Sequence, residues 1–305
     1  MFSIIIPTFN NINYLKICLK SLKKNSRFNH QTIIHVNEGT DGTLDFVKKN
    51  KLIFTYSREN IGLCSAVNCA AKKASTNYII YAHDDMYFCP GWDIAFTEEL
   101  NKINHNLFYL SGTMIQPVYG HIQLNCGDNY INFNEEKLLS KYKLINYHDF
   151  QGTHWSPHLL HKDMWNNVGG LSEEFNPGIG SDPDLNMKLW KNNVRIFKGL
   201  SNCRVYHFGS ISLRKKTSLK RNRGSKTFLK KWGMSVGFFL KYYLEGSKYV
   251  YNQSIITKKY TGPLKDPEIS FLYLIELFLC KINYIYNKYF QLYFNLTCEE
   301  FLKIV

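Results

Sequence analysis

The stretch YIIYAHDDMYFCPGW (78–92) joins a run of apolar residues to two adjacent carboxylates, Asp84 and Asp85. The run YIIYA is typical of a buried strand, because β-branched and aromatic residues dominate it. Two neighbouring anions at the end of a core strand repel each other and are costly to remove from water, so they persist when they are solvated or when a cation lies between them. The stretch therefore indicates either a cation site or a solvated turn in which Asp84 caps the helix near Pro90.

The residues before this stretch alternate strand patterns with helical patterns. Strands are predicted at SIIIPTF (3–9), TIIHV (32–36) and LIFTYS (52–57), and helices at INYLKICLKSLKK (12–24), LDFVKKN (44–50) and LCSAVNCAAKKA (63–74). We expect Pro7 to end the first strand, because proline lacks an N–H for the ladder. Strands that alternate with helices predict an α/β fold with a parallel sheet covered on both faces. Ligands of such sheets bind beyond the carboxyl ends of the strands, and a polar cluster follows each strand here.

The later part of the chain continues with fewer clear signals. Strands are predicted at FYLSGTMI (108–115), VRIFKG (194–199) and NCRVYHFGS (202–210), a strand entering a short helix at HLLHKDMWNNVGGL (158–171), and helices at SDPDLNMKLWKNN (181–193), WGMSVGFFLKYYLEG (232–246) and EISFLYLIELFLCKINYIYNKYFQLYF (268–294). A glycine-containing loop, FNPGIG (175–180), precedes the helix predicted at 181–193 and is expected to be flexible.

Composition limits the class of protein. With 305 residues, 45% of them hydrophobic, the chain is long and apolar enough for one large domain or for a domain with an appendage. The eight cysteines form no CxxC pair, which favours buried thiols in a reducing compartment over disulfides or a zinc site. The N-terminus lacks the basic region of a signal peptide, so a cytoplasmic location is expected. The run ISFLYLIELFLC (269–280) contains Glu276 and is shorter than the roughly 20 residues of a membrane span.

Positive charge is concentrated at the C-terminal end. Residues 213–305 hold 17 Lys and Arg against six Asp and Glu, and RKKTSLKRNRGSKTFLKK (214–231) holds nine basic residues and no acid. We therefore divide the chain into residues 1–212 and a basic, aromatic-rich helical region at 213–305. This region suits an anionic membrane surface, an acidic substrate or a solvated basic face, whereas no motif for nucleic-acid recognition is present.

Four motifs in order support a family assignment: SIIIPTFN (3–10), VNEGTDGT (36–43), ENIGLCSAVNCA (59–70) and YAHDDMYFCPGW (81–92). Together they resemble the nucleotide-sugar-binding half of family 2 glycosyltransferases of the GT-A fold. The resemblance continues through NVGGLSEEF (167–175), SDPDLNMKLW (181–190) and VYHFGS (205–210), and so covers about residues 2–212.

The resemblance implies a donor site at the ends of the first strands. It assigns nucleotide-sugar binding to Pro7, Thr8, Asn10, Glu38, Arg58, Asn60 and Asp84. Glu38 would accept from a base N–H, Arg58 would donate to base or diphosphate, and Asp84 would contact the ribose or metal-bound water. Helix capping is the alternative role for Thr8 and Asn10.

The resemblance also implies a metal site and a general base. Asp85 matches the ligand for Mn²⁺ or Mg²⁺ and His207 the family's late histidine, while His83 stands where many members have a first aspartate or asparagine. Asp182 matches the base that deprotonates the acceptor hydroxyl. The alternatives are a structural histidine and an acidic first helical turn that complements the helix dipole.

Two further residues are assigned to the acceptor side of the site. Asp184 is expected there as a position that supports the base, and Trp155 as an aromatic side chain that stacks on a sugar. Packing of Trp155 in the core is the alternative. The neighbouring histidines of GTHWSPHLLH (152–161) match no metal-binding spacing.

The combined hypothesis is an inverting, metal-assisted glycosyltransferase. It would move a sugar from a nucleotide-diphosphate sugar, with UDP as the expected nucleotide, to a hydroxyl of a glycan, lipid-linked or protein acceptor, at a membrane surface if the basic region binds lipid. Two other classes stay open: a nucleotide-sugar-binding protein without activity, and a basic membrane-associated module. A nicotinamide-dependent enzyme is disfavoured because no GxGxxG follows the first strand.

Overall fold

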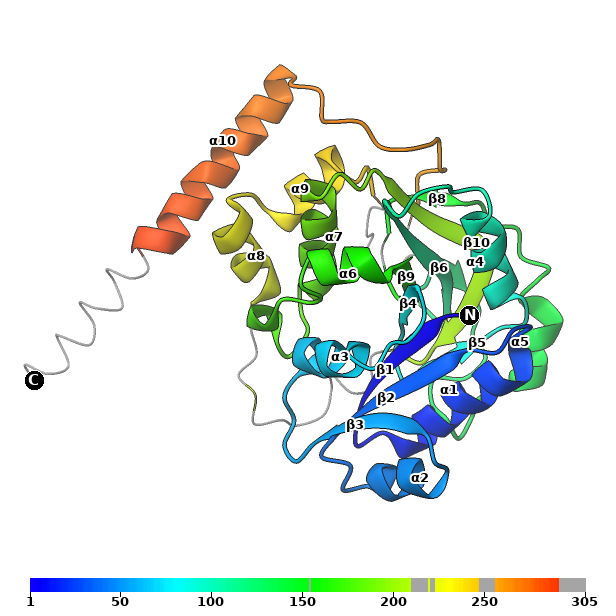
Figure 1. The fold of residues 1–305 in the computed structure, drawn as a ribbon. Helices are drawn as coiled ribbons and strands as arrows, with labels where there is room; N and C mark the ends of the chain where they lie inside the picture. The colour runs from blue at the N-terminus through cyan, green and yellow to red at the C-terminus, as the bar shows by residue number, and fades with distance from the viewer. Residues whose placement is uncertain (154, 210–218, 220–222, 247–255, 291–305) are drawn as a thin grey trace, which may run out of the picture.

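The structure is a computed structural model, and it describes residues 1–153, 155–209, 219, 223–246 and 256–290 (Figure 1). Its strands are β1 (Ser3–Phe9), β2 (Gln31–Asn37), β3 (Ile53–Ser57), β4 (Tyr78–Tyr81), β5 (Met86–Phe88), β6 (Phe108–Gln116), β7 (Ile122–Gln123), β8 (Phe150–Gln151), β9 (His158–His161) and β10 (Ile196–His207). Its helices are α1 (Ile12–Asn25), α2 (Thr43–Lys49), α3 (Leu63–Ala71), α4 (Trp92–Leu100), α5 (Glu135–Lys141), α6 (Lys162–Asn167), α7 (Ser181–Lys191), α8 (Gly224–Trp232), α9 (Val236–Tyr242) and α10 (Phe271–Ile285), with a 3₁₀ turn at η1 (Glu173–Phe175) and a π turn at η3 (Tyr286–Phe290).

These strands form one sheet in the order β3-β2-β1-β4-β9-β6-β10-β5, with β7 beside β6 and β8 beside β10. β1 to β4 run parallel, as predicted, whereas β9 is antiparallel to both β4 and β6, and β5 is antiparallel to β10. The α/β fold is confirmed, but the sheet is mixed. Parallel neighbours need a crossover connection, and only the first part of the chain places a helix after each strand.

Helices cover both faces of the sheet, which fixes the layers. Along β1, Ile5 packs with α3 and α7 on one face, while Ile4 and Ile6 pack with α1 and α4 on the other. Figure 1 shows α3, α6 and α7 on one side of the sheet and α1 and α4 on the other. The cysteines of the described residues are free thiols, as expected.

The first strand does not end at Pro7. β1 continues to Phe9, which pairs with Asn37 of β2. The reason is the position of β4, which pairs with β1 only as far as Tyr81, opposite Ile5. The backbone nitrogen of Pro7 faces the same neighbour, β4, as the backbone of Ile5, two residues earlier. At the level of Pro7, however, β4 has already ended. No ladder hydrogen bond is lost there, so proline is tolerated.

Two other boundaries differ from the prediction. The strands expected at 194–199 and 202–210 are one strand, β10, with an irregular register between Leu200 and Arg204. The helix expected from Trp232 is divided, because Gly233 takes a left-handed conformation that ends α8 and the Ser235 side chain caps α9.

The C-terminal region shares the core of the rest of the chain. Phe228 of α8 and Phe239 of α9 belong to the same buried cluster as Leu185 and Trp190 of α7. The division at residue 212 stays a prediction, but α8 and α9 have no core of their own. The part of the basic stretch that precedes α8, residues 214–223, lies outside the described residues except for 219 and 223. No helix among those that the structure describes is both long and apolar enough to cross a bilayer.

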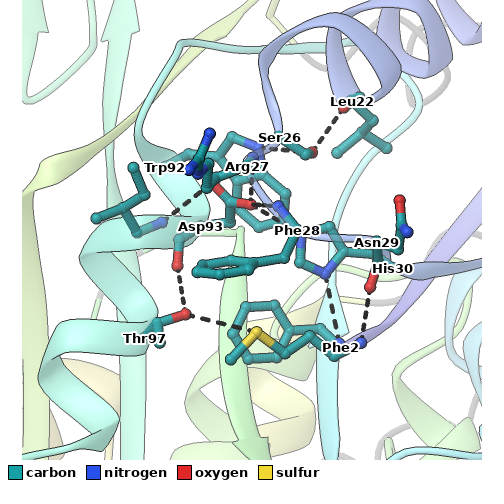
Figure 2. Close-up of polar contacts among 12 residues, drawn as sticks. Phe2, Leu22, Ser26, Arg27, Phe28, Asn29, His30, Trp92, Asp93 and Thr97 are labelled. Atoms are coloured by element: carbon teal, nitrogen blue, oxygen red, sulfur yellow. Dashed lines mark hydrogen bonds and ion pairs between the residues drawn. The ribbon is translucent and has the colours of Figure 1, made fainter.

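A buried carboxylate joins α1, β2 and α4 at the amino ends of the strands. Asp93 is fully buried, and its Oδ2 accepts from the backbone N–H groups of Arg27 and Phe28 at 2.7 and 2.9 Å and lies 3.0 Å from Nε2 of His30 (Figure 2). Burial acts to raise the pKa of Asp93, but the bonds from His30 and the two amides hold it below its ordinary value. This network stabilises the fold on the edge away from the polar strand ends.

Candidate nucleotide-sugar and metal site

The ends of β1 and β2 bring two predicted donor-site residues into contact. Asn10 and Glu38 both have left-handed backbones, with φ of 47° and 59°. The Asn10 amide donates to the Glu38 carboxylate at 3.0 Å, and its oxygen accepts from the Thr40 N–H at 2.8 Å. Pro7 and Thr8 precede this pair, and Oγ1 of Thr8 is buried without a hydrogen-bond partner among the described residues. A buried hydroxyl without a partner indicates a group that a ligand satisfies.

The loop after β3 lies beside this pair. Oδ1 of Asn37, at the end of β2, accepts from the Ser57 hydroxyl at 2.9 Å and from the Ile61 N–H at 3.0 Å. Asn60 forms a local turn by accepting from the Gly62 N–H at 2.9 Å, and Arg58 is exposed. The structure therefore places both predicted residues at the edge where β1 and β2 end, with Arg58 exposed.

Three ligand-type side chains meet at the end of β4. Ligand atoms of His83, Asp85 and His207 lie within 4.8 Å of one another. His207 reaches this place because β10 is antiparallel to β5, which puts it opposite Met86, and because the Phe208 N–H bonds to the carbonyl of Asp85 at 3.1 Å. The sequence analysis treated His83 as a departure that removes a carboxylate. The structure shows instead that its imidazole belongs to the cluster.

The donor set fits a divalent cation. Nε2 of His207 is buried and lacks a hydrogen bond within the described part of the chain, although Oδ1 of Asp85 lies only 3.1 Å away. Two cis ligands on an octahedral ion, with bonds of about 2.1 Å, are about 3 Å apart. Nδ1 of His207 contacts the Gln116 amide, which orients the ring. Burial, with the nearby His207, lowers the pKa of His83 to about 4 and keeps this imidazole neutral, as a ligand must be.

Asp84 lies beside this cluster without belonging to it. It is as buried as Asp85, with 3% and 2% of their surfaces exposed. The prediction of a solvated turn is therefore wrong, because neither carboxylate faces bulk water. The role of Asp84 toward a ribose or metal-bound water stays a prediction.

Asp182 is the second residue of α7, which lies on the side of the sheet that holds α3. Its Oδ1 is buried without a hydrogen-bond partner in the described residues, and burial raises its pKa from 3.8 to about 7. Its charge adds to the effect of burial in raising the pKa values of Cys64, Tyr81 and Tyr109. The Tyr81 hydroxyl lies 2.9 Å from Nε2 of His83, so one tyrosine connects the surroundings of Asp182 to the ligand cluster.

Two residues that the sequence analysis did not select lie in the same region. The hydroxyls of Tyr109 and Ser111 are buried without hydrogen-bond partners among the residues described. They occupy alternate positions of β6, and so one face of it, next to His158 of β9. The sequence signal that could have identified them is the pair of hydroxyl side chains at alternate positions of a buried strand, because buried hydroxyls need hydrogen-bond partners.

The two acceptor-side residues occupy different surroundings. Trp155 is half-buried, packs against the core under α1 and α4, and lies 5.3 Å from the His121 ring. Asp184 is fully buried and both its oxygens accept hydrogen bonds, from Ser172 at 2.6 Å and Trp232 at 2.8 Å. Asp184 therefore supports α7 and presents no oxygen to an acceptor. An acceptor contact of Trp155 stays a prediction.

This fold, with a polar edge at the strand ends and an acidic helix start beside a His and Asp cluster, defines the class: a glycosyltransferase of the GT-A fold. The family model for glycosyl transferase family 2 matches residues 3–156, and the chain belongs to this family.

Relatives and solved structures agree with the family. The hyaluronan synthase of Pasteurella multocida is 27% identical over 228 residues, which cover 72% of this chain and 22% of that protein, so the chain spans about a fifth of its relative's length. S. aureus TarS 1–349 in complex with UDP-GlcNAc superposes with a TM-score of 0.53 at 18% identity, covering 78% of this chain and 66% of that one. GalNAc-T7 with UDP, GalNAc and Mn²⁺ gives 0.54 at 13% identity, covering 79% and 49%. At these identities the two structures establish the fold alone.

Proposed function

We propose that this glycosyltransferase moves a sugar from a UDP-sugar to a hydroxyl of a glycan, lipid-linked or protein acceptor, with inversion at the anomeric carbon. The observation that carries the proposal is the state of Asp182, a sheltered carboxyl with a pKa near 7, next to a tyrosine that contacts the His83, Asp85 and His207 cluster. UDP and Mn²⁺ are supported by their presence in the complexes of TarS and GalNAc-T7.

The donor would bind at the ends of β1, β2 and β3. Glu38, whose carboxylate accepts a hydrogen bond from Asn10, would accept from a base N–H, and the exposed Arg58 would donate to base or diphosphate. The buried hydroxyl of Thr8 needs a partner that the nucleotide would provide. Pro7 and Asn60 would line the same site, and Asp84 would contact the ribose or metal-bound water.

The cluster of His83, Asp85 and His207 would hold Mn²⁺ or Mg²⁺, which when bound neutralises the charge that develops on the departing diphosphate. Asp182 then removes the proton from the acceptor hydroxyl while the hydroxyl oxygen forms its bond to the anomeric carbon. The bond from this carbon to the diphosphate oxygen breaks on the opposite face, and the electron pair leaves with UDP. One displacement inverts the centre and needs no covalent enzyme intermediate.

A thermal-shift panel of UDP-, dTDP- and GDP-sugars with and without Mn²⁺ tests the proposal. A ligand that binds only the folded protein raises the melting temperature, so a Mn²⁺-dependent shift is expected with UDP-sugars. Asp85→Ala should remove the shift, while Asp182→Asn should keep it and slow UDP release about 10²- to 10⁴-fold. Asp45→Asn, an exposed position on α2, is the matched control. Binding without turnover in the wild-type protein, across a panel of acceptors, would instead support the sugar-binding class.

The same proposal places the enzyme on an anionic membrane through α10. One face of α10 packs on the chain through Tyr273, which is 8% exposed and lies 3.2 Å from the Tyr243 hydroxyl. The other face is apolar and exposed, with Phe271, Leu274, Ile275, Phe278, Leu279, Ile282 and Ile285. The net charge of +14 complements anionic lipid and opposes pairing with a second copy.

Co-sedimentation with phosphatidylcholine vesicles, with and without phosphatidylglycerol, tests this contact. Binding should require the anionic lipid and weaken with salt. It should be lost in the Phe278→Ser, Ile282→Ser variant and kept in Leu144→Ser, which changes an even more exposed residue before β8. If wild type binds neither kind of vesicle but self-associates, and the Phe278→Ser, Ile282→Ser variant does not self-associate, the exposed face of α10 would be a contact between two copies of the chain.

A further inference from the structure

The buried carboxylate of Asp184 contacts one cation and one indole N–H donor from the C-terminal region. Nζ of Lys231 lies 2.9 Å from Oδ1 of Asp184, and the indole N–H of Trp232 donates to the same oxygen at 2.8 Å. Lys231 also donates to the Ser172 hydroxyl at 2.8 Å and pairs with Glu174 at 2.6 Å. A buried carboxylate without such partners is strongly destabilising, so these contacts fix Asp184 relative to the end of α8.

Asp184 and Asp182 belong to the same first turn of α7. Residues two positions apart are about 200° apart around a helix, so Asp184 faces α8 while Asp182 faces away from it, toward the surroundings of Tyr81. The helix lacks a side-chain cap: Gly180 is its N-cap residue, with φ of 89°. Contacts from outside the helix therefore decide how this turn is oriented.

The start of α8 contacts the same turn. A Cβ on Gly224 would lie 2.4 Å from the Ile179 carbonyl oxygen, and a Cβ on Gly180 would lie 2.9 Å from Cα of Gly224. Backbones approach this closely only where both residues lack side chains. α8 thus touches the loop before α7 with its first residue and Asp184 with its last two. The loop expected to be flexible is also held by α3, through the Leu63 N–H to the Pro177 carbonyl at 3.2 Å.

We propose that Lys231 and Trp232 are positioning residues for catalysis: through Asp184 they set the orientation of the first turn of α7 and so the place of the Asp182 carboxylate at the acceptor hydroxyl. The C-terminal region is then part of the catalytic unit. This inference rests on the proposed role of Asp182 as the base.

The test compares Lys231→Met, Trp232→Phe and the control Lys230→Met, an exposed neighbour on α8. UDP release is measured with the UDP-sugar that gives the largest thermal shift, and kcat is expressed per molecule that binds UDP with Mn²⁺, so that unfolded protein is not counted. We expect kcat to fall about 10- to 100-fold in the first two variants, with the donor KM within twofold of wild type and Lys230→Met unchanged. Lys231→Arg, which keeps the charge, should recover most of the loss.

Other outcomes overturn the inference in distinguishable ways. Wild-type kcat per binding-competent molecule in both Lys231→Met and Trp232→Phe would show that α8 does not position the base. A loss that disappears once binding-competent molecules are counted would show a role in stability alone. Wild-type turnover in Asp182→Asn would instead remove the proposed base, whatever the α8 variants do.

Discussion

The sheltered carboxyl of Asp182 predicts that pH changes activity and stability in opposite directions. Burial raises its pKa from 3.8 to about 7. A pKa raised by about three units corresponds to about 4 kcal/mol of lost stability in the folded chain when Asp182 is ionised. This is an upper value, because the half-buried residue keeps some contact with water. Ionised Asp182 therefore destabilises the fold that needs it for catalysis.

The sign follows from proton binding. Between about pH 4 and pH 7 the folded chain keeps the proton on Asp182 while the unfolded chain has lost it, so the free energy of unfolding falls as the pH rises through this range. Asp182→Asn has no such proton. We expect this variant to be more stable than wild type at pH 8, by up to about 4 kcal/mol, and the difference to disappear toward pH 4.

Activity should show the reverse dependence. A general base acts only when ionised, so kcat/KM should fall about tenfold for each pH unit below about 7, and Asp182→Asn should lose about 10²- to 10⁴-fold. Urea unfolding at pH 5 and pH 8, with UDP release between pH 5 and 8, measures both effects, and Asp45→Asn serves as control. A stability difference that is equal at the two pH values, or a flat pH–rate profile, would refute the reasoning.

Three further predictions concern the metal cluster and the core. Asp85→Asn should lose the Mn²⁺-dependent thermal shift with UDP, and a shift equal to wild type would remove Asp85 from the ligand set. Asp93→Ala leaves two backbone amides without their acceptor and should lower the free energy of unfolding by about 3 kcal/mol; an unchanged urea midpoint would contradict this. Gly199→Ala places a methyl 1.9 Å from the Phe150 ring and should destabilise by about 1–3 kcal/mol, whereas Gly237→Ala, whose methyl would lie 3.9 Å from Oγ of Ser235, should not.

Local signals predicted much of the fold and selected the candidate donor-site residues, whose roles stay a prediction. The strand patterns at 3–9 and 78–81 and the polar residues after them were sufficient, because short apolar runs rich in β-branched and aromatic residues, and the turns that follow them, are encoded by neighbours in sequence. Asp182 was selected because SDPDLNMKLW (181–190) resembles an acidic motif of the family, whereas an acidic first helical turn was the alternative explanation. The same signals could not show that β5, β8 and β9 run against the other strands of the sheet, since strand direction depends on partners far away in the chain.

His83 and Asp184 show what local patterns leave undecided. From the sequence, His83 was a histidine where many family members have a carboxylate or an amide. The antiparallel pairing of β5 with β10 places His207 beside Asp85, so that the three side chains form one cluster. Asp184 was expected to support the base, but its partner Lys231 belongs to a region that the sequence analysis had separated from the catalytic part.

The sequence by itself determined the family, the order of the strands with their polar ends, and the residue types available for the chemistry, because these depend on motifs and on short-range periodicity. Only the tertiary structure decided which of those residues meet. Strand pairing across the sheet and the packing of α8 on α7 join positions far apart in the chain, and the burial that raises the pKa of Asp182 exists only once those contacts have formed.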